Sequence, residues 1–210
     1  MIMKTKVWIM IYFLVMSVTL TVAQTDTISS GFFKPNTRNY SVTNAVEVES
    51  LFPMFFYGGY HLGVGYRYQK IRVRVSVING GTYDAEPAGV SNHSAQFKRF
   101  YKPSPGIFLG YNFWKNMEFY GFLEHHTFGI EQKSTGWQQN IHSIDYGFGL
   151  GYQFFIGRYV YIQPAFHVYL RAEKTLQFSN IQYKIPTTDL APVIRVGVRL
   201  WKRFPGTRHP

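Results

Sequence analysis

The sequence predicts an all-β protein, an eight-stranded antiparallel up-and-down transmembrane β-barrel with short periplasmic turns and longer extracellular loops. Three observations favour this fold: segments in which large apolar residues alternate with small or polar ones, connections that are alternately short and long, and a targeting segment at the start of the chain. The clearest alternation runs over residues 144–154. Successive side chains of a strand point to opposite faces, so this segment has one apolar and one polar face. Its eleven residues suit a tilted strand that crosses a bilayer.

The start of the chain has the pattern of an export signal. Lys4 and Lys6 precede an uncharged apolar run over residues 7–20, and small residues follow up to Ala23. An N-terminal membrane anchor is the alternative, but a spanning helix needs about 20 apolar residues, more than this run contains. We therefore expect four parts, namely a signal peptide, a flexible periplasmic leader, the outer-membrane barrel and a C-terminal tail: residues 1–23, 24–43, 44–204 and 205–210.

Composition narrows the possible functions. The chain has no cysteine, so neither disulfide nor thiolate chemistry is expected. Aromatic residues make up 19% of it and it contains 19 glycines, both high for an ordinary soluble protein. The formal charge of +11 is scattered along the chain rather than grouped on one element, so we expect no nucleic-acid partner. Part of this charge suits an anionic lipid surface.

Eight segments alternate with the period of a strand, at about residues 44–52, 56–68, 71–78, 106–114, 117–128, 144–154, 159–171 and 190–204. The first alternates valine with glutamate, the second alternates large apolar residues with glycine, and the third alternates valine and isoleucine with arginine. The fourth and sixth set aromatic and aliphatic residues against glycine. The fifth is the least regular, since both its faces carry aromatic residues. The last two alternate apolar residues with glutamine, histidine, glycine and arginine.

The connections also alternate. Residues 69–70, 115–116 and 156–158 are short enough for tight turns, whereas the connections at 79–105, 129–140 and 172–189 are long. Short turns on the periplasmic side and long loops outside are typical of outer-membrane barrels. Aromatic residues gather at the turn side, as in a headgroup-level girdle: Tyr66, Tyr68, Phe113, Trp114, Phe119, Tyr152, Phe154, Tyr159, Trp201 and Phe204. A soluble lipocalin-type barrel would be polar outside, but the polar face here is rich in glycine, which favours a narrow lumen.

Over about residues 44–204 the chain resembles the OmpA/OmpX-like barrels, the small eight-stranded outer-membrane proteins of Gram-negative bacteria. The resemblance includes a last strand whose apolar residues are in phase with a terminal aromatic: Ile194, Val196, Val198, Leu200 and Phe204. Such a strand resembles the signal read by the barrel-insertion machinery, although residues 205–210 extend beyond it. The resemblance implies a monomer in the cell outer membrane, in contact with membrane lipid and lipopolysaccharide.

Charged residues lie on the polar, inward phase of the strands: Glu47, Glu49, Arg67, Arg72, Arg74, Glu124, Asp145, Arg195 and Arg199, with Glu118 on a less regular strand. Closure of the barrel places the first strand beside the eighth, so the two glutamates of the first can meet the two arginines of the last. A charge in a narrow lumen must be paired or hydrated. The favoured interpretation is therefore an ion-pair network that plugs the barrel, and the alternative is a narrow porin-like channel.

Five residues raise the question of metal binding or catalysis. His61, His126 and His167 share the inward phase, which suits polar filling or, alternatively, a Zn²⁺ or Cu²⁺ site. His125 and Thr127 are on the outward phase, where His-x-Thr is faintly similar to the His-x-Ser of lipid A 3-O-deacylases. Threonine replaces the serine, and an acidic partner for the histidine is not evident. An interfacial polar pair is therefore favoured over a lipid A-modifying hydrolase, and neither a metal nor another cofactor is expected.

The 79–105 connection is long enough to be a functional loop. It carries aromatic and basic residues that are candidates for binding lipopolysaccharide phosphates, a host surface or a partner protein: Tyr83, Phe97, Lys98, Arg99, Tyr101 and Lys102. Alternatively, its aromatic residues cap the barrel. The function that the sequence favours is that of a non-enzymatic structural anchor, which presents extracellular loops for surface or partner binding.

Overall fold

The computed structural model describes residues 42–83, 96–156, 159–179 and 181–203. The strands that form its barrel are β1 (Asn44–Leu51), β2 (Gly59–Tyr68), β3 (Ile71–Tyr83), β4 (Phe97–Trp114), β5 (Met117–Gln132), β6 (Gln138–Tyr152), β8 (Val160–Arg171) and β11 (Thr188–Arg203). A short strand, β7 (Phe154–Ile156), continues β6 after a break at Gln153 and also pairs with β8. The expected signal peptide, most of the leader, the C-terminal tail and Phe204 lie outside the described residues.

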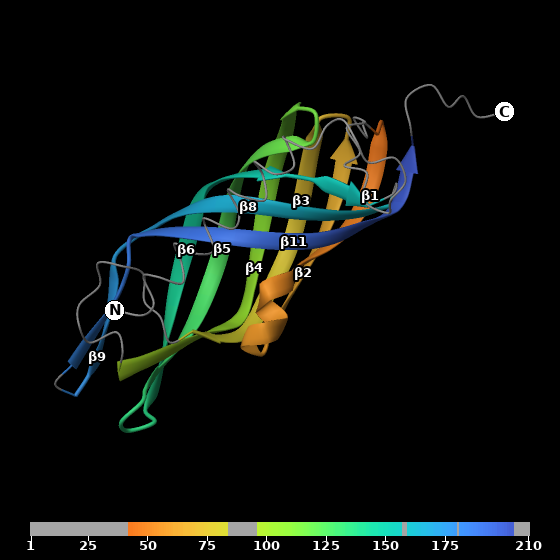
Figure 1. Cartoon of the computed structure of the whole chain (residues 1–210). Coiled ribbons are helices and arrows are strands. Elements are labelled where there is room, and N and C mark those ends of the chain that lie inside the picture. Colours follow the sequence, from red (N-terminus) through yellow and green to blue (C-terminus); the bar gives the residue numbers. More distant parts are fainter. Residues whose placement is uncertain (1–41, 84–95, 157–158, 180, 204–210) are drawn as a thin grey trace, which may run out of the picture. The chain divides into compact units, whose positions relative to one another are not determined.

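The barrel strands pair antiparallel with their neighbours in the order β11, β1, β2, β3, β4, β5, β6 and β8, and a pairing between β8 and β11 closes the ring. At the seam, Val48 of β1 pairs with Val198 of β11, and Val196 pairs with Ile162 of β8. Figure 1 shows β8 and β11 crossing over the strands of the opposite wall. The fold predicted from the sequence, a closed eight-stranded antiparallel β-barrel, is confirmed.

The strands differ from the predicted ones mainly where the alternation stops. The second strand begins at Gly59 rather than at residue 56, because Phe52–Tyr57 form a 3-10 helix with a proline in its first turn. That helix ends at Gly58, whose φ of 75° is a left-handed conformation that favours glycine. Turns at 69–70 and 115–116 are where the sequence places them.

At the loop side the strands continue far beyond the predicted ends. Thr82 of β3 still pairs with Phe100 of β4, and Glu131 of β5 pairs with Gln138 of β6. The predicted loops at 79–105 and 129–140 were therefore wrong in extent, since most of their described residues are strand. Within 172–189, β9 (Lys174–Phe178) and β10 (Ile181–Ile185) form a separate hairpin. Backbone hydrogen bonds sustain these extensions without an apolar outer face, which is why the period-two pattern does not reveal them.

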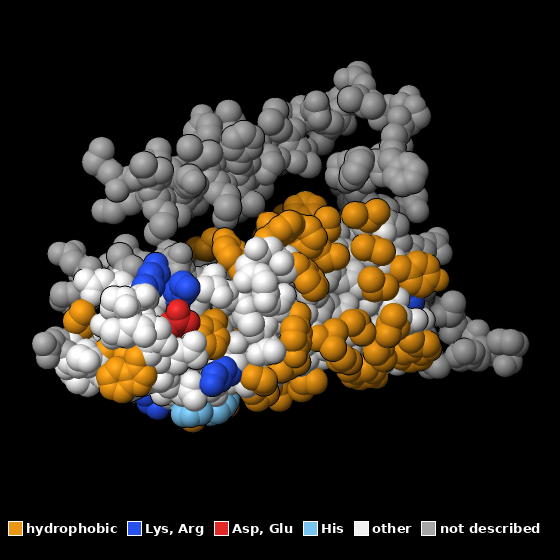
Figure 2. All heavy atoms as spheres, turned by 90° about the horizontal axis from the view of Figure 1, so that it is seen from below, with side chains coloured by type: hydrophobic (Ala, Val, Ile, Leu, Met, Phe, Trp, Pro, Cys, Tyr) orange, Lys and Arg blue, Asp and Glu red, His pale blue; other side chains and the backbone are white. Residues whose placement is uncertain are grey.

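The outer wall of the barrel is apolar. Large hydrophobic side chains are exposed on the outside of every barrel strand except β1, whose outward Val46 and Val48 are partly buried. Leu109, Ile144 and Leu200 are 60%, 61% and 65% exposed. Figure 2 shows such side chains over much of the wall, with charged and histidine side chains gathered toward one end. The inner residues are charged instead, and Arg72 and Glu118 are fully buried. This is the reverse of a lipocalin-type barrel.

Glycines on the inner face make room for large side chains from the neighbouring strand. Tyr120 of β5 is paired with Gly149 of β6, and a Cβ added at Gly149 would lie 2.5 Å from Cζ of the tyrosine ring. Gly121 faces the other way, and a Cβ there would have no neighbour closer than the carbonyl oxygen of Gly147, at 3.7 Å. The lumen therefore tolerates no side chain at Gly149, whereas the outer wall tolerates one at Gly121.

These two glycines provide a matched pair of substitutions. We expect Gly149→Ala to destabilise the folded barrel by about 1 to 3 kcal/mol, because the methyl group displaces Tyr120. Gly121→Ala should change stability by less than about 0.5 kcal/mol. Urea unfolding in lipid vesicles, followed by tryptophan fluorescence, measures both. Equal stability of the two variants would contradict the packing described here.

Candidate functional site

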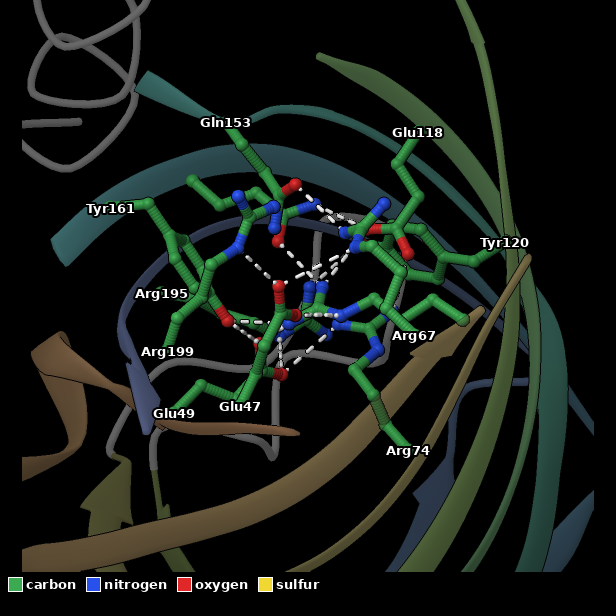
Figure 3. A network of polar contacts seen from close by, with 12 residues as sticks. Glu47, Glu49, Arg67, Arg74, Glu118, Tyr120, Gln153, Tyr161, Arg195 and Arg199 are labelled. Carbon is green, nitrogen blue, oxygen red and sulfur yellow. Dashed lines mark hydrogen bonds and ion pairs between the residues drawn. The ribbon is translucent and has the colours of Figure 1, made fainter. Parts of the chain in front are cut away.

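The charged residues of the inward phase meet inside the barrel. Each charged residue that the sequence predicts for the ion-pair network is at most 5% exposed, and Glu118 is fully buried. The other residues of this set are Glu47, Glu49, Arg67, Arg72, Arg74, Glu124, Asp145, Arg195 and Arg199. Figure 3 shows side chains from opposite walls of the barrel pointing toward one another. We call the cluster formed by Glu47, Glu49, Glu118 and the five arginines Arg67, Arg72, Arg74, Arg195 and Arg199 the lumen network.

Arg72 of β3 links carboxylates from two other strands. Its Nε lies 2.6 Å from Oε2 of Glu47 and its Nη2 lies 2.7 Å from Oε2 of Glu49, both on β1. On the other side, its Nη1 lies 3.1 Å from Oε2 of Glu118 on β5. In the sheet order β1 and β5 are each two strands away from β3. One guanidinium therefore links carboxylates of β1 and β5 across the lumen, and the stretch from β1 to β5 comprises five of the eight barrel strands.

The same two glutamates also join the seam at which the barrel closes. Arg199 Nε lies 2.9 Å from Glu47 Oε1, and these two residues are paired in the register of β1 and β11. Arg195 Nε lies 3.3 Å from Glu49 Oε1. Because each glutamate also contacts Arg72, the seam and the β3 wall share their ion pairs.

Arginines outnumber glutamates in the lumen network, five to three, and neutral groups complete it. Tyr161 donates to Glu49 Oε2 at 2.9 Å, and Gln163 donates to Glu118 Oε2 at 2.7 Å. The face of the Tyr120 ring accommodates part of the surplus positive charge. The guanidinium carbon of Arg74 lies 4.6 Å from the centroid of this ring, and the guanidinium carbon of Arg195 lies 5.1 Å from it. The network is thus packed with partners rather than with bulk water.

Glu124 and Asp145 have their contacts in a second cluster nearer the loop side. Asp145 Oδ2 accepts from Nε of Arg171 at 2.8 Å and lies 2.8 Å from Nδ1 of His126. Glu124 Oε2 lies 3.7 Å from Nε2 of the same histidine. Sequence reasoning missed the part played by Arg171, although it shares the inward phase of its strand.

The three inward histidines do not converge. His61 Nδ1 accepts from the backbone of Leu51 at 3.2 Å, His126 contacts Asp145, and His167 Nε2 lies 2.5 Å from the hydroxyl of Tyr120. Within the described ranges, no group of three or more histidine, aspartate or glutamate side chains is arranged to hold a metal ion. Their placement suits the polar filling of the lumen.

On the outer wall, Thr127 pairs with a histidine that the sequence does not single out. Thr127 Oγ1 lies 3.1 Å from Nδ1 of His142, the residue opposite it on β6. The ring of His125 stacks on that of His142 with centroids 6.0 Å apart. Neither histidine contacts a carboxylate among the residues that the structure describes. A base and a hydroxyl are present, but the acidic group that would orient the base is not seen with them.

The loop-side end of the barrel is closed by an apolar cluster, which we call the outer cap. It consists of buried residues from β4, β5, β6 and the hairpin: Phe97, Phe128, Ile130, Ile141, Phe178, Tyr183 and Ile185. Gln139 of β6 donates to the backbone of Gln177 at 2.8 Å, which fastens the hairpin. Figure 1 shows β9 at this end of the barrel.

The candidate binding residues of the 79–105 connection divide between the outer cap and the surface. Phe97 belongs to the cap, Tyr101 packs against it, and Arg99 is 8% exposed. Lys98 is half exposed and lies 3.5 Å from Glu131. Lys102 is partly exposed, and the side chain of Tyr83 lies outside the described residues.

Comparison with known proteins assigns the chain to no family, the OmpA/OmpX-like barrels included. No family model matches the sequence, and no curated protein matches it. Among solved structures, the chain is similar to that in "Crystal structure of Neisserial surface protein A (NspA)", with a TM-score of 0.38 and 14% identity over 74% of this chain and 91% of that one. At this identity and TM-score the similarity does not establish a function for this chain.

Proposed function

We propose that this protein is an outer-membrane β-barrel whose plugged, non-enzymatic barrel anchors a rigid recognition surface at its loop-side end. The observation that carries the proposal is the inverted distribution of polarity, with exposed leucine and isoleucine on the wall and buried arginine and glutamate in the lumen. In water, such a wall would expose an apolar area far larger than soluble proteins display. In a bilayer the same wall is solvated by lipid, and closure satisfies every strand edge.

The lumen network supports an anchor rather than a pore. Glu47, Arg72 and Glu118 are inaccessible to water inside the barrel. A conducting path through this layer requires that ion pairs at 2.6 to 3.1 Å separate, which leaves buried charges without partners. We therefore place the narrow-channel interpretation second.

Recognition is assigned to the loop-side end because that is where polar and aromatic groups are both exposed and held in place. Trp137 is 49% exposed, and its ring meets that of Phe178 in the outer cap at 5.8 Å. Lys98 in the extension of β4 and Lys184 in the β9–β10 hairpin are also about half exposed. A surface that is ordered before binding loses little entropy on binding. Lipopolysaccharide phosphates and a protein surface are both suitable partners.

Cell fractionation combined with planar-bilayer recording tests the proposal. We expect the protein to remain in the outer-membrane fraction after a urea wash and to give no unit conductance steps after reconstitution. A protein released by the wash would refute the membrane location. Steps in the wild type that change in size in Glu47→Gln or Arg195→Gln would instead establish the channel.

Removal of the central guanidinium tests the structural role of the lumen network. Arg72→Met leaves three buried carboxylates without one of their partners, and we expect a loss of about 3 to 5 kcal/mol in the free energy of unfolding. The control is Lys184→Met, which removes a half-exposed ion pair with Glu173 and should cost less than about 1 kcal/mol. Urea unfolding in vesicles provides both values. If the two variants unfold alike, the network does not hold the barrel together.

A further inference from the structure

An apolar groove interrupts the outer wall in its turn-side half. It has a volume of about 310 Å³ and is formed by residues of β3, β4 and β5: Ile71, Leu109, Gly110, Tyr111, Phe119 and Gly121. Gly121 is paired with Leu109, and on its own strand it stands between the outward-facing Phe119 and Leu123. The absence of a side chain at this one outward position therefore produces the hollow.

The groove lies within the part of the wall that we propose to be in the bilayer, so the groups that contact it there are the acyl chains of lipids. Its walls are two aromatic and two aliphatic side chains, of which Leu109 is 60%, Ile71 50% and Phe119 48% exposed. In a bilayer, apolar groups associate through close packing rather than through exclusion of water. A hollow of this shape accommodates a flexible hydrocarbon chain better than a smooth wall does.

A cation lies at the turn-side end of the groove. The Lys70 ammonium is 6.0 Å from the centroid of the Tyr111 ring, and the Lys70 carbonyl accepts from the backbone of Asn112 at 2.8 Å. Lys115, in the next turn, lies 5.0 Å from the Trp114 ring. Both lysines are exposed.

No described carboxylate offsets these two lysines on the outer surface. Of the acidic residues in the described ranges, Glu47 and Glu118 are nearest to the turns, and both are fully buried in the lumen network. The rim beside the groove is therefore positively charged at headgroup level, which suits a phosphate.

We propose that the groove and its lysines form a binding site for one anionic glycerophospholipid of the inner leaflet. One acyl chain lies over Gly121 between Leu109 and Phe119, and the headgroup phosphate lies near Lys70 and Lys115. The inference rests on the proposed membrane location, because the turn side then faces the periplasm.

Native mass spectrometry of the full chain, extracted from membranes in a mild detergent, tests this site. The probes are phosphatidylglycerol and phosphatidylethanolamine, titrated separately. We expect one phosphatidylglycerol to bind more tightly than phosphatidylethanolamine, by about fivefold for each lysine that contributes. Equal binding of the two lipids, or stepwise uptake of many copies without a first tight one, would overturn the proposal.

Three variants separate the groove from its rim. A Cβ at Gly121 would have no neighbour closer than 3.7 Å, so the backbone admits a side chain there. Gly121→Leu fills the hollow and should weaken phosphatidylglycerol binding by about tenfold through the loss of roughly ten carbon contacts. The control, Val64→Leu, enlarges a residue of β2 that is 45% exposed on the wall and should bind like the wild type. The double variant Lys70→Gln and Lys115→Gln should lose the preference for phosphatidylglycerol but retain the groove.

If Gly121→Leu binds phosphatidylglycerol like the wild type, the groove does not hold the acyl chain. If the double variant still prefers phosphatidylglycerol to phosphatidylethanolamine, the two lysines do not bind the phosphate. Each variant is also checked for retention in the urea-washed membrane fraction. A protein that stays in the membrane but fails these titrations contradicts the lipid site alone. A protein that never enters the membrane contradicts the proposed function first.

Discussion

Charges buried in the lumen must be paired within the lumen, and the strand register at the seam and the positions of the inward glycines both depend on this pairing. Arg72 contacts Glu47, Glu49 and Glu118, while Arg195 and Arg199 bring the last strand to the first through the same glutamates. A shift of one residue in the register of β1 and β11 would turn these side chains to the lipid side, where an unpaired charge is costly. The lumen network therefore favours one register at the seam in addition to filling the barrel.

The same constraint explains where the glycines lie. The five arginines of the lumen network and the aromatic rings that they contact would not fit in a narrow barrel if every inward position carried a side chain. Gly149 beside Tyr120 supplies that room on the inner face. Gly121, on the outer face, has no such partner and leaves a groove instead. Inward and outward glycines thus have different consequences, one for stability and the other for what the wall can bind.

The period of two in the sequence is enough to predict the barrel and to group its inward charges, because alternation reports directly which face each residue occupies. It does not identify the partners across the lumen. The contact of Arg72 with Glu118 depends on the tilt of strands that are not neighbours, and that of Thr127 with His142 depends on a register set by a hairpin. The strand extensions were missed because their apolar residues, such as Phe128 and Ile130, face inward into the outer cap, in the opposite phase from the apolar residues of the wall. The sequence suggested a cap only through the aromatic residues of the 79–105 connection, and it did not predict the contribution of the β9–β10 hairpin. A proline and a glycine around residues 52–58 were the only signals of the 3-10 helix there.

The central claim is that a closed, ion-paired barrel resides in a membrane, and its mobility on an SDS gel with and without heating tests this most directly. Membrane-extracted protein should run as a faster, compact band when it is not boiled and at its full mass of 24.4 kDa, or less if a signal peptide is removed, after boiling. Such heat-dependent mobility is expected of a barrel whose backbone hydrogen bonds are all satisfied internally. A single band of the same mobility under both conditions, from a protein that stays soluble after export, would contradict the account.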